Sequence, residues 1–200
     1  MPLGSAEALA LAGMMGSGKS TVAAELCLLH GRRVVSTDAE VVRRAGKPIA
    51  AIFGEDGEAA FRALERAVVA SLTGPLVIDL GGGVFCDPAS ASRLLATARV
   101  VFLDVAAGEA ARRIAADPGA GARPLLDRWS ALLARRLPLY RRAHHTVEVG
   151  GLAAAAVARK IVDLVARGAP FDRVLAGGVR GERAQGDRGS ARERWLGEEG

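Results

Sequence analysis

Eight residues, Gly13–Ser20, constrain this chain more than any others. Their sequence, GMMGSGKS, matches the pattern G-x-x-x-x-G-K-[ST], in which glycines let successive backbone N–H groups converge on phosphate oxygens. The motif needs a buried strand before it and a helix after it, because the helix N-terminus adds a favourable dipole. Ala8–Ala12 is short and apolar, and Ser20–Leu29 has helical spacing. The sequence therefore predicts a loop that binds nucleotide phosphates.

Apolar strand-like segments and helical patterns alternate along the first 167 residues. Helical patterns, such as the one at 58–72, separate the apolar runs. This alternation implies right-handed crossovers and a parallel sheet covered on both faces, with ligands at the carboxyl ends of the strands. We therefore expect the α/β class, with a three-layer αβα architecture. Its five-stranded parallel sheet would use segments 8–12, 34–36, 76–80, 100–105 and 146–149.

Two segments are expected to lie outside this regular core. A stretch with Pro118 and two glycines interrupts the pattern and predicts a mobile lid near 113–127. From residue 168 onward the chain turns to Gly, Arg and Glu with little periodicity, which is typical of a flexible tail. The expected organisation is one domain at 1–167 and a C-terminal tail at 168–200.

Composition excludes several classes of protein. No run approaches 18 apolar residues, so no membrane segment is expected. Cys27 and Cys86 are 59 residues apart with no CxxC pattern, which favours a reducing cytoplasm over a disulfide framework or a zinc site. The net charge of +5 comes mainly from arginine, which suggests residue-usage bias or anionic small substrates rather than nucleic acid. We expect a cytoplasmic monomer.

Five further motifs follow the phosphate-binding loop in a fixed order. They are Ser36-Thr37-Asp38, FRALE at 61–65, Gly81-Gly82-Gly83, RPLL at 123–126 and RLPLY at 136–140. Together with the loop, they resemble the shikimate kinase family over about Leu9 to Val165. The resemblance implies a P-loop kinase fold with a mobile lid. It also implies magnesium-dependent transfer of the ATP γ-phosphoryl group to the 3-hydroxyl of shikimate, in aromatic amino-acid (chorismate) biosynthesis.

The resemblance also implies roles for individual residues. Lys19, Asp38 and Arg123 would be catalytic: Lys19 would reach the β and γ phosphates, Asp38 would activate the acceptor hydroxyl, and Arg123 in the lid would neutralise charge on the transferred group. Arg62 and Arg136 would hold the acceptor carboxylate, beside Asp38 and the backbone of Gly82. The expected ATP-binding residues are Gly16, Ser17, Gly18, Lys19, Ser20, Thr21, Arg113 and Arg123, with Arg113 packing on adenine.

Simpler interpretations of these residues stay open. Arg62 has Glu58 and Glu65 at helical spacing, so it could form ion pairs on a helix surface. Arg136 has other arginines close to it and could belong to a solvated basic face. Gly81-Gly82-Gly83 could be a flexible turn, and Arg113 an ordinary arginine near a helix end.

One position departs from the family pattern. Family members usually carry an acid two residues before Asp38, where it contributes to the magnesium site, and this chain has Ser36 there. Asp79 ends the apolar run at 76–80, where the family usually has a small or neutral residue. Ends of neighbouring parallel strands lie about 5 to 10 Å apart, so we expect Asp79, with Ser20, to direct magnesium in place of the missing acid. Alternatively, Asp79 caps a loop N–H or pairs with an arginine.

Three other functions compete with the favoured one. Another sugar-acid kinase, such as gluconate kinase, shares the phosphate-binding loop but is not expected to combine FRxxE, RPLL and RxPLY. A non-catalytic nucleotide-binding regulator is conceivable because of Ser36 and the altered lid, although Lys19 and Asp38 are both present. A nucleic-acid-binding protein is suggested by the basic charge alone.

Overall fold

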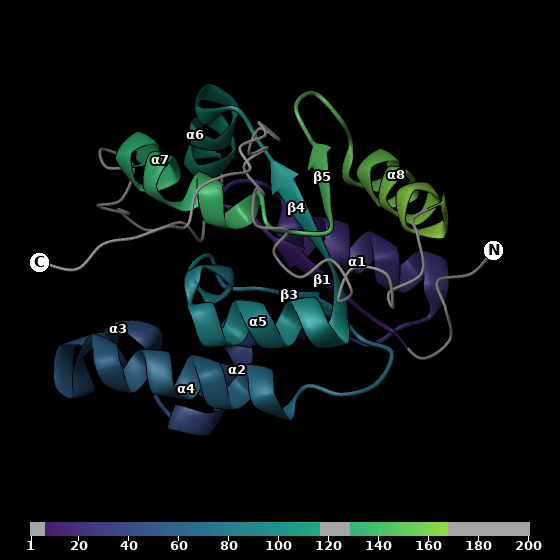
Figure 1. The fold of residues 1–200 in the computed structure, drawn as a ribbon. Helices are drawn as coiled ribbons and strands as arrows, with labels where there is room; N and C mark the ends of the chain where they lie inside the picture. The colour runs from purple at the N-terminus through teal and green to yellow at the C-terminus, as the bar shows by residue number, and fades with distance from the viewer. Residues whose placement is uncertain (1–6, 117–128, 168–200) are drawn as a thin grey trace, which may run out of the picture. The chain divides into compact units, whose positions relative to one another are not determined.

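The computed structural model describes residues 7–116 and 129–167 (Figure 1). All of these residues belong to the first of two compact units, residues 1–169. The predicted tail at 168–200 lies outside the described residues. So do Arg123, the RPLL motif and most of the predicted lid.

One sheet is formed by five strands: β1 (Ala8–Ala12), β2 (Val34–Ser36), β3 (Val77–Asp79), β4 (Ala98–Asp104) and β5 (His145–Glu148). All pairings are parallel, and the spatial order is β2-β3-β1-β4-β5. The expected five-stranded parallel sheet is therefore confirmed. β3 is shorter than the predicted strand at 76–80, but Leu76 and Leu80 still exchange backbone hydrogen bonds with β1, of 2.8 and 3.2 Å.

Among residues 7–116 and 129–167, no helix is long and apolar enough to cross a bilayer.

Helices alternate with these strands as the sequence predicts. The α-helices are α1 (Lys19–His30), α2 (Thr37–Ala45), α3 (Ile49–Ala51), α4 (Gly57–Ser71), α5 (Pro88–Thr97), α6 (Ala107–Ala115), α7 (Trp129–Tyr140) and α8 (Ala154–Arg167); a π-helical turn spans Ile52–Asp56 and a 3₁₀ turn spans Val84–Cys86.

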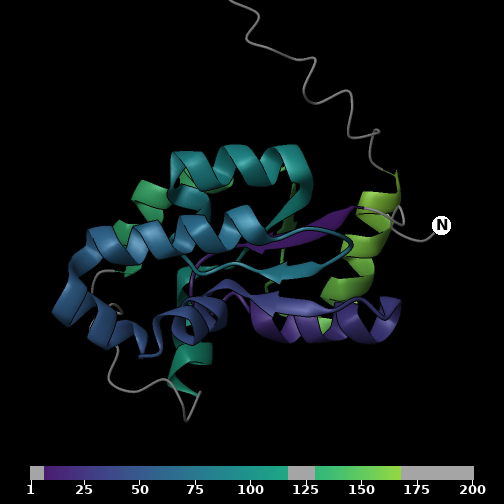
Figure 2. The same ribbon diagram turned by 90° about the horizontal axis from the view of Figure 1, so that it is seen from below.

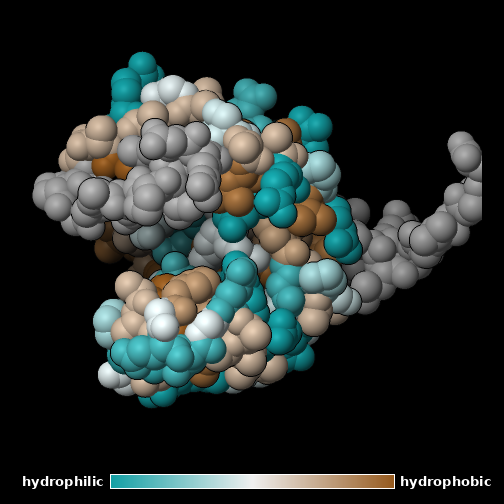
Figure 3. Space-filling view, turned by 90° about the vertical axis from the view of Figure 1, so that its left-hand side faces the viewer, coloured by the Kyte–Doolittle hydropathy of each residue, from teal (hydrophilic) through white to brown (hydrophobic). Residues whose placement is uncertain are grey.

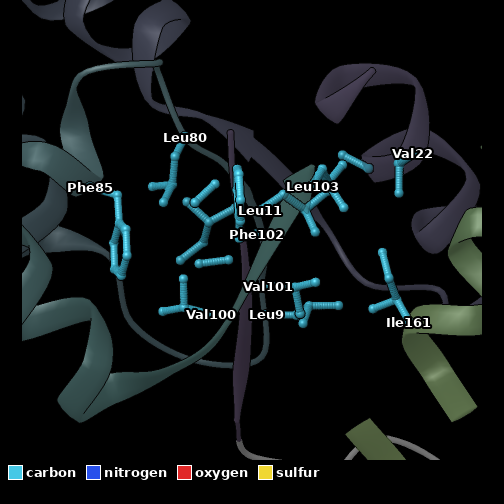
Figure 4. Close-up of a cluster of buried hydrophobic side chains, with 14 of the residues drawn as sticks. Leu9, Leu11, Val22, Leu80, Phe85, Val100, Val101, Phe102, Leu103 and Ile161 are labelled. Atoms are coloured by element: carbon cyan, nitrogen blue, oxygen red, sulfur yellow. The ribbon is translucent and has the colours of Figure 1, made fainter. Parts of the chain in front are cut away.

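The three layers are the sheet and the helices on its two faces. Figure 2 shows the strands running between α5 on one side and α1 on the other. Side chains from both layers meet the buried strands: Val22 of α1 and Ile161 of α8 lie on one side of β1 and β4, and Phe85 lies on the other (Figure 4). The central strands are buried on both faces, which is why they read as continuous apolar runs. The expected three-layer αβα fold is confirmed.

A second, smaller core holds α2 and α4 together. Its buried members are Val41 of α2, Ile52 of the π-helical turn, and Phe61 and Val68 of α4. Each such side chain contributes about 1.5 to 3 kcal/mol on burial. Because α2 also carries Asp38 and α4 also carries Arg62, this cluster fixes where both polar side chains emerge.

Candidate active site

A cleft of about 820 Å³ lies at the carboxyl ends of β1, β2 and β3. Figure 3 shows the hollowed side of the molecule, where hydrophilic side chains gather. This is where an α/β sheet is expected to bind ligands, since loops and helix N-termini converge there. The predicted site residues that line the cleft are Gly16, Gly18, Lys19, Ser20, Thr21, Asp38, Arg62, Asp79, Gly82, Arg113 and Arg136.

Glycine is required at several positions of the loop between β1 and α1. Gly16 and Gly18 have φ of +80° and +84°, in the left-handed region that other residues rarely adopt. A β-carbon at Gly16 would also lie 2.7 Å from the Ala110 carbonyl oxygen, and one at Gly13 would lie 2.9 Å from that of Leu103. The loop therefore packs tightly on α6 and β4 and presents its backbone to the cleft.

The Lys19 side chain folds back over this loop. Its Nζ donates hydrogen bonds to the carbonyl oxygens of Gly13 and Met14, at 2.9 and 3.1 Å. Burial lowers the pKa of Lys19, and the nearby Asp79 and Asp38 carboxylates oppose that shift. A cation held above a cradle of N–H groups matches the negative charge of nucleotide phosphates.

Ser20, the first residue after Lys19, contacts the end of β3. Its hydroxyl donates a 2.7 Å hydrogen bond to Oδ2 of Asp79, which is 8% exposed. Ser36 instead caps α2, because its hydroxyl accepts a 3.4 Å hydrogen bond from the Ala39 N–H. The expected proximity of Asp79 to Ser20 is therefore present, and the role of Asp79 toward a metal stays a prediction.

Each glycine of the Gly81-Gly82-Gly83 loop packs against a different polar side chain. A β-carbon at Gly81 would overlap the Asp38 carboxylate, and one at Gly83 would overlap the Arg62 guanidinium. One at Gly82 would lie 3.4 Å from a guanidinium nitrogen of Arg136. The three glycines thus let α2, α4 and α7 bring one carboxylate and two guanidinium groups to the same short stretch of backbone.

Arg62 combines the two arrangements considered from the sequence. It lines the cleft, and it also pairs with Glu65 at 2.5 Å and Glu58 at 3.1 Å. Glu65 is only 2% exposed, and burial raises its pKa while Arg62 opposes the rise. Glu65 therefore holds Arg62 from within the protein, whereas the exposed Glu58 lies on the solvent side.

The structure gives Tyr140 a role that sequence reasoning left unassigned, and it places Glu65 in the interior rather than on the helix surface considered from the sequence. Tyr140 donates a 2.5 Å hydrogen bond to the Gly82 carbonyl oxygen and stacks on Phe102 at 5.0 Å between ring centroids. Glu65 orients Arg62, as described above. Both belong to motifs named from the sequence, RLPLY and FRALE, so the signal was their membership in those motifs.

Arg113 lies beside the phosphate-binding loop. It donates hydrogen bonds to the carbonyl oxygens of Ser17 and Val149, at 3.4 and 3.1 Å, and pairs with Glu109. A second cavity of about 240 Å³ adjoins it, lined by Ser17, Gly18, Thr21, Val22, Arg113, Val149, Leu152, Ala154 and Val157. Its lining is partly apolar. A flat heterocycle such as the expected adenine needs an environment of this kind.

The donor groups near Ser20 suit a hard cation that shares its coordination with a nucleotide. Within residues 7–116 and 129–167, no group of three or more His, Cys, Asp or Glu side chains could enclose a metal ion by itself. The Ser20 hydroxyl and the Asp79 and Asp38 carboxylates nevertheless give the cleft an oxygen-rich side. Magnesium usually keeps several waters and binds one or two protein oxygens plus substrate phosphates, so these residues fit it.

Comparisons with known proteins show which family this chain is similar to. The family model described as shikimate kinase matches residues 15–166. A shikimate kinase of Thermobifida fusca is 47% identical over 137 residues, covering 65% of this chain and 77% of that relative. One from Synechococcus sp. is 42% identical over 175 residues, covering 81% and 88%. The structure of an Acinetobacter baumannii shikimate kinase in complex with shikimate superposes with a TM-score of 0.74 at 33% identity, covering 80% and 93%.

A phosphate-binding loop beneath a cleft that gathers a carboxylate and two arginines defines a P-loop kinase of small molecules. The family match covers residues 15–166, a range that contains the phosphate-binding loop from Met15 onward, Gly81-Gly82-Gly83, Arg62 and Arg136. The chain belongs to the shikimate kinase family. The resemblance seen in its motifs is thus confirmed, and with it the expected ATP-dependent kinase activity.

Proposed function

We propose that this protein transfers the γ-phosphoryl group of ATP to the 3-hydroxyl of shikimate, with the residue roles expected from the sequence. The observation that carries this proposal is the packing of Asp38, Arg136 and Arg62 against three successive glycines. A small ring with one carboxylate and several hydroxyls would meet two guanidinium groups, a carboxylate and bare backbone at that place. Guanidinium groups bind carboxylates bidentately, and glycine allows close approach of the ring.

The nucleotide side of the cleft is proposed to hold ATP by its phosphates. Backbone N–H groups of Gly16 to Ser20 would surround the β phosphate at the N-terminus of α1, and Lys19 would move from its two carbonyl partners to the γ phosphate. Arg113 and the cavity beside it would receive the adenine. Arg123, which lies outside the described residues, is proposed to bind the transferred group from the lid.

Asp38 is proposed to accept the proton of the acceptor hydroxyl. As that oxygen bonds to the γ phosphorus, the bond from this phosphorus to the β–γ bridging oxygen breaks. The electron pair of the broken bond stays on the bridging oxygen, and ADP leaves. Burial and the neighbouring Asp79 raise the pKa of Asp38, with Lys19 and Arg62 opposing, which makes its carboxylate a better base. Magnesium, when bound with ATP through Ser20, supplies charge neutralisation at the phosphates.

The proposed reaction uses two small partners, ATP and shikimate. Both cysteines, Cys27 and Cys86, are free thiols. We propose that the protein is a monomer that works in the cytoplasm. Sedimentation with and without ligands would test the monomeric state.

The carboxylate clamp makes a prediction about Arg62 and Arg136. Replacing either with alanine is expected to raise KM for shikimate about 10- to 100-fold, because each removes a charged hydrogen-bonding partner of the carboxylate. KM for ATP should change by no more than about threefold. Initial-rate kinetics with each substrate varied in turn would measure both constants.

Neighbouring arginines provide matched controls for this test. Arg66, one turn along α4, pairs with Asp87 instead, and Arg135 is an exposed residue next to Arg136. Arg66→Ala and Arg135→Ala should leave both KM values unchanged. An Arg62→Ala variant that lost thermal stability but kept its KM for shikimate would show that Arg62 serves only the ion pairs with Glu58 and Glu65.

A further inference from the structure

Two positions that matter for the metal are partners in the sheet. One is position 36, where the family usually carries an acid and this chain has Ser36, and the other is Asp79. β2 and β3 pair in parallel, and their register places Ser36 opposite Asp79. β3 lies between β2 and β1, and β1 leads directly into the phosphate-binding loop. An acid at position 79 therefore lies in the same register as one at position 36, but on the strand next to β1 and so nearer to the phosphate-binding loop.

In the hydrogen bond between Ser20 and Asp79, Ser20 is the donor. Because the Ser20 hydroxyl donates its proton to Oδ2 of Asp79 at 2.7 Å, the oxygen lone pairs of Ser20 are left for another partner. Both residues line the same cleft, so those lone pairs are available on the side where phosphates would enter. Without this acceptor, the Ser20 hydroxyl would lose the partner that fixes the direction of its O–H bond.

Burial gives a second reason to assign Asp79 a role. Its residue is 8% exposed, and a carboxylate at the end of an apolar strand is costly unless its charge is compensated. Lys19 and Ser20 compensate part of this charge from the loop. A divalent cation next to Ser20 would compensate it further, and an aspartate on a strand beside the loop is a recurring partner of magnesium in P-loop enzymes.

We propose that Asp79 is a magnesium-positioning residue that replaces the acid absent at Ser36. It fixes the Ser20 hydroxyl as a metal ligand and accepts a hydrogen bond from metal-bound water. This inference rests on the proposed function, since it concerns the magnesium that accompanies ATP. It does not depend on which acceptor the enzyme uses.

The test is a binding measurement on the full chain without any acceptor. Mg²⁺ is titrated calorimetrically into the protein saturated with ADP, and ADP affinity is measured separately in EDTA. Asp79→Asn is expected to weaken Mg²⁺ binding about 10- to 100-fold, as typical for a residue that supports a metal ligand. Metal-free ADP should bind within about threefold of the wild-type affinity, because the backbone contacts of the loop are retained.

Two further variants make the comparison specific. Asp104→Asn makes the same substitution at the end of β4, outside the cleft, and should leave Mg²⁺ affinity unchanged. Adding Ser36→Asp to Asp79→Asn should recover most of the lost affinity by returning the acid to the partnered position. Aspartate caps helices as well as serine does, so the cap of α2 is preserved.

Several results would overturn the proposal. Unchanged Mg²⁺ affinity in Asp79→Asn, or an equal loss of ADP affinity with and without the metal, would show that Asp79 only supports the loop. Failure of Ser36→Asp to recover any affinity would refute the exchange of positions. Thermal unfolding checks each variant, and Asp79→Ser, which is smaller and neutral, provides a second measurement if Asp79→Asn does not fold. Inactivity toward shikimate with normal Mg²⁺ binding would contradict the proposed function instead.

Discussion

Replacing Lys19 with alanine is expected to lower kcat about 100- to 1000-fold, the loss seen when one preorganised charge contact to a transition state is removed. Lys19 is the cation of the phosphate-binding loop, and its Nζ donates hydrogen bonds to the carbonyl oxygens of Gly13 and Met14. Negative charge builds on the γ-phosphoryl oxygens during transfer, so losing the ammonium group raises the barrier more than it weakens ATP binding. A coupled assay of ADP release measures kcat.

The fold should tolerate this change. Lys19 contributes no side chain to either hydrophobic cluster, and burial already disfavours its charge, as its lowered pKa indicates. Lys160→Ala, at an exposed position of α8, is the matched control and should retain full activity. Near-normal turnover in folded Lys19→Ala would contradict the role given to the loop.

Replacing Asp38 with asparagine is expected to lower kcat about 100- to 10,000-fold, the range for removal of a general base. Asparagine keeps the size and the packing against Gly81 but cannot take the proton of the acceptor. Because the active form is the carboxylate, wild-type kcat/KM should fall as the pH drops through the pKa of Asp38. Burial and Asp79 raise that pKa above its ordinary value.

The pH profile separates catalysis from structure. Asp38→Asn should lack the acidic limb that Asp38 causes, while its melting temperature stays close to that of the wild type. Asp163→Asn, at an exposed site on α8, should keep both the limb and the rate. A folded Asp38→Asn enzyme with an unchanged profile would assign the proton to another acceptor.

Much of the fold was predictable because its signals are local. The strands at the centre of the sheet are buried on both faces, so β1 and β4 appear as apolar runs. The glycines of the phosphate-binding loop are required by backbone geometry within eight residues. The predicted strand boundaries differ from the observed ones by one or two residues. At β3 this is because the hydrogen bond between Leu9 and Leu76 lies just before its first residue, Val77.

The gathering of side chains around Gly81-Gly82-Gly83 could not be derived from local patterns. Asp38, Arg62 and Arg136 lie on three helices far apart in sequence, and their meeting depends on how those helices dock. Their roles were inferred from family resemblance, and the packing of each glycine against a different partner is visible only in three dimensions. The Tyr140 contact with Gly82 went unassigned for the same reason.

The neighbouring positions of Ser20 and Asp79 were inferred from the rule that parallel strand ends meet at one edge of a sheet. That rule predicts that the two residues lie near each other, but it does not predict the order of the strands in the sheet. The order β2-β3-β1 and the pairing of Ser36 with Asp79 come from tertiary packing. The partnered positions of Ser36 and Asp79, on which the proposed exchange of acids rests, are therefore visible only once the sheet is assembled.

The acceptor is tested most directly by measuring ADP release by the purified full chain with shikimate, with gluconate and with no acceptor, at saturating ATP and magnesium. We expect kcat/KM for shikimate to exceed that for gluconate by at least about 100-fold, because a site built to hydrogen-bond one acceptor leaves polar groups unpaired with another. Without an acceptor, ADP release should be slow. Equal or faster turnover with gluconate, or ADP release independent of any acceptor, would contradict the assignment of shikimate as the substrate.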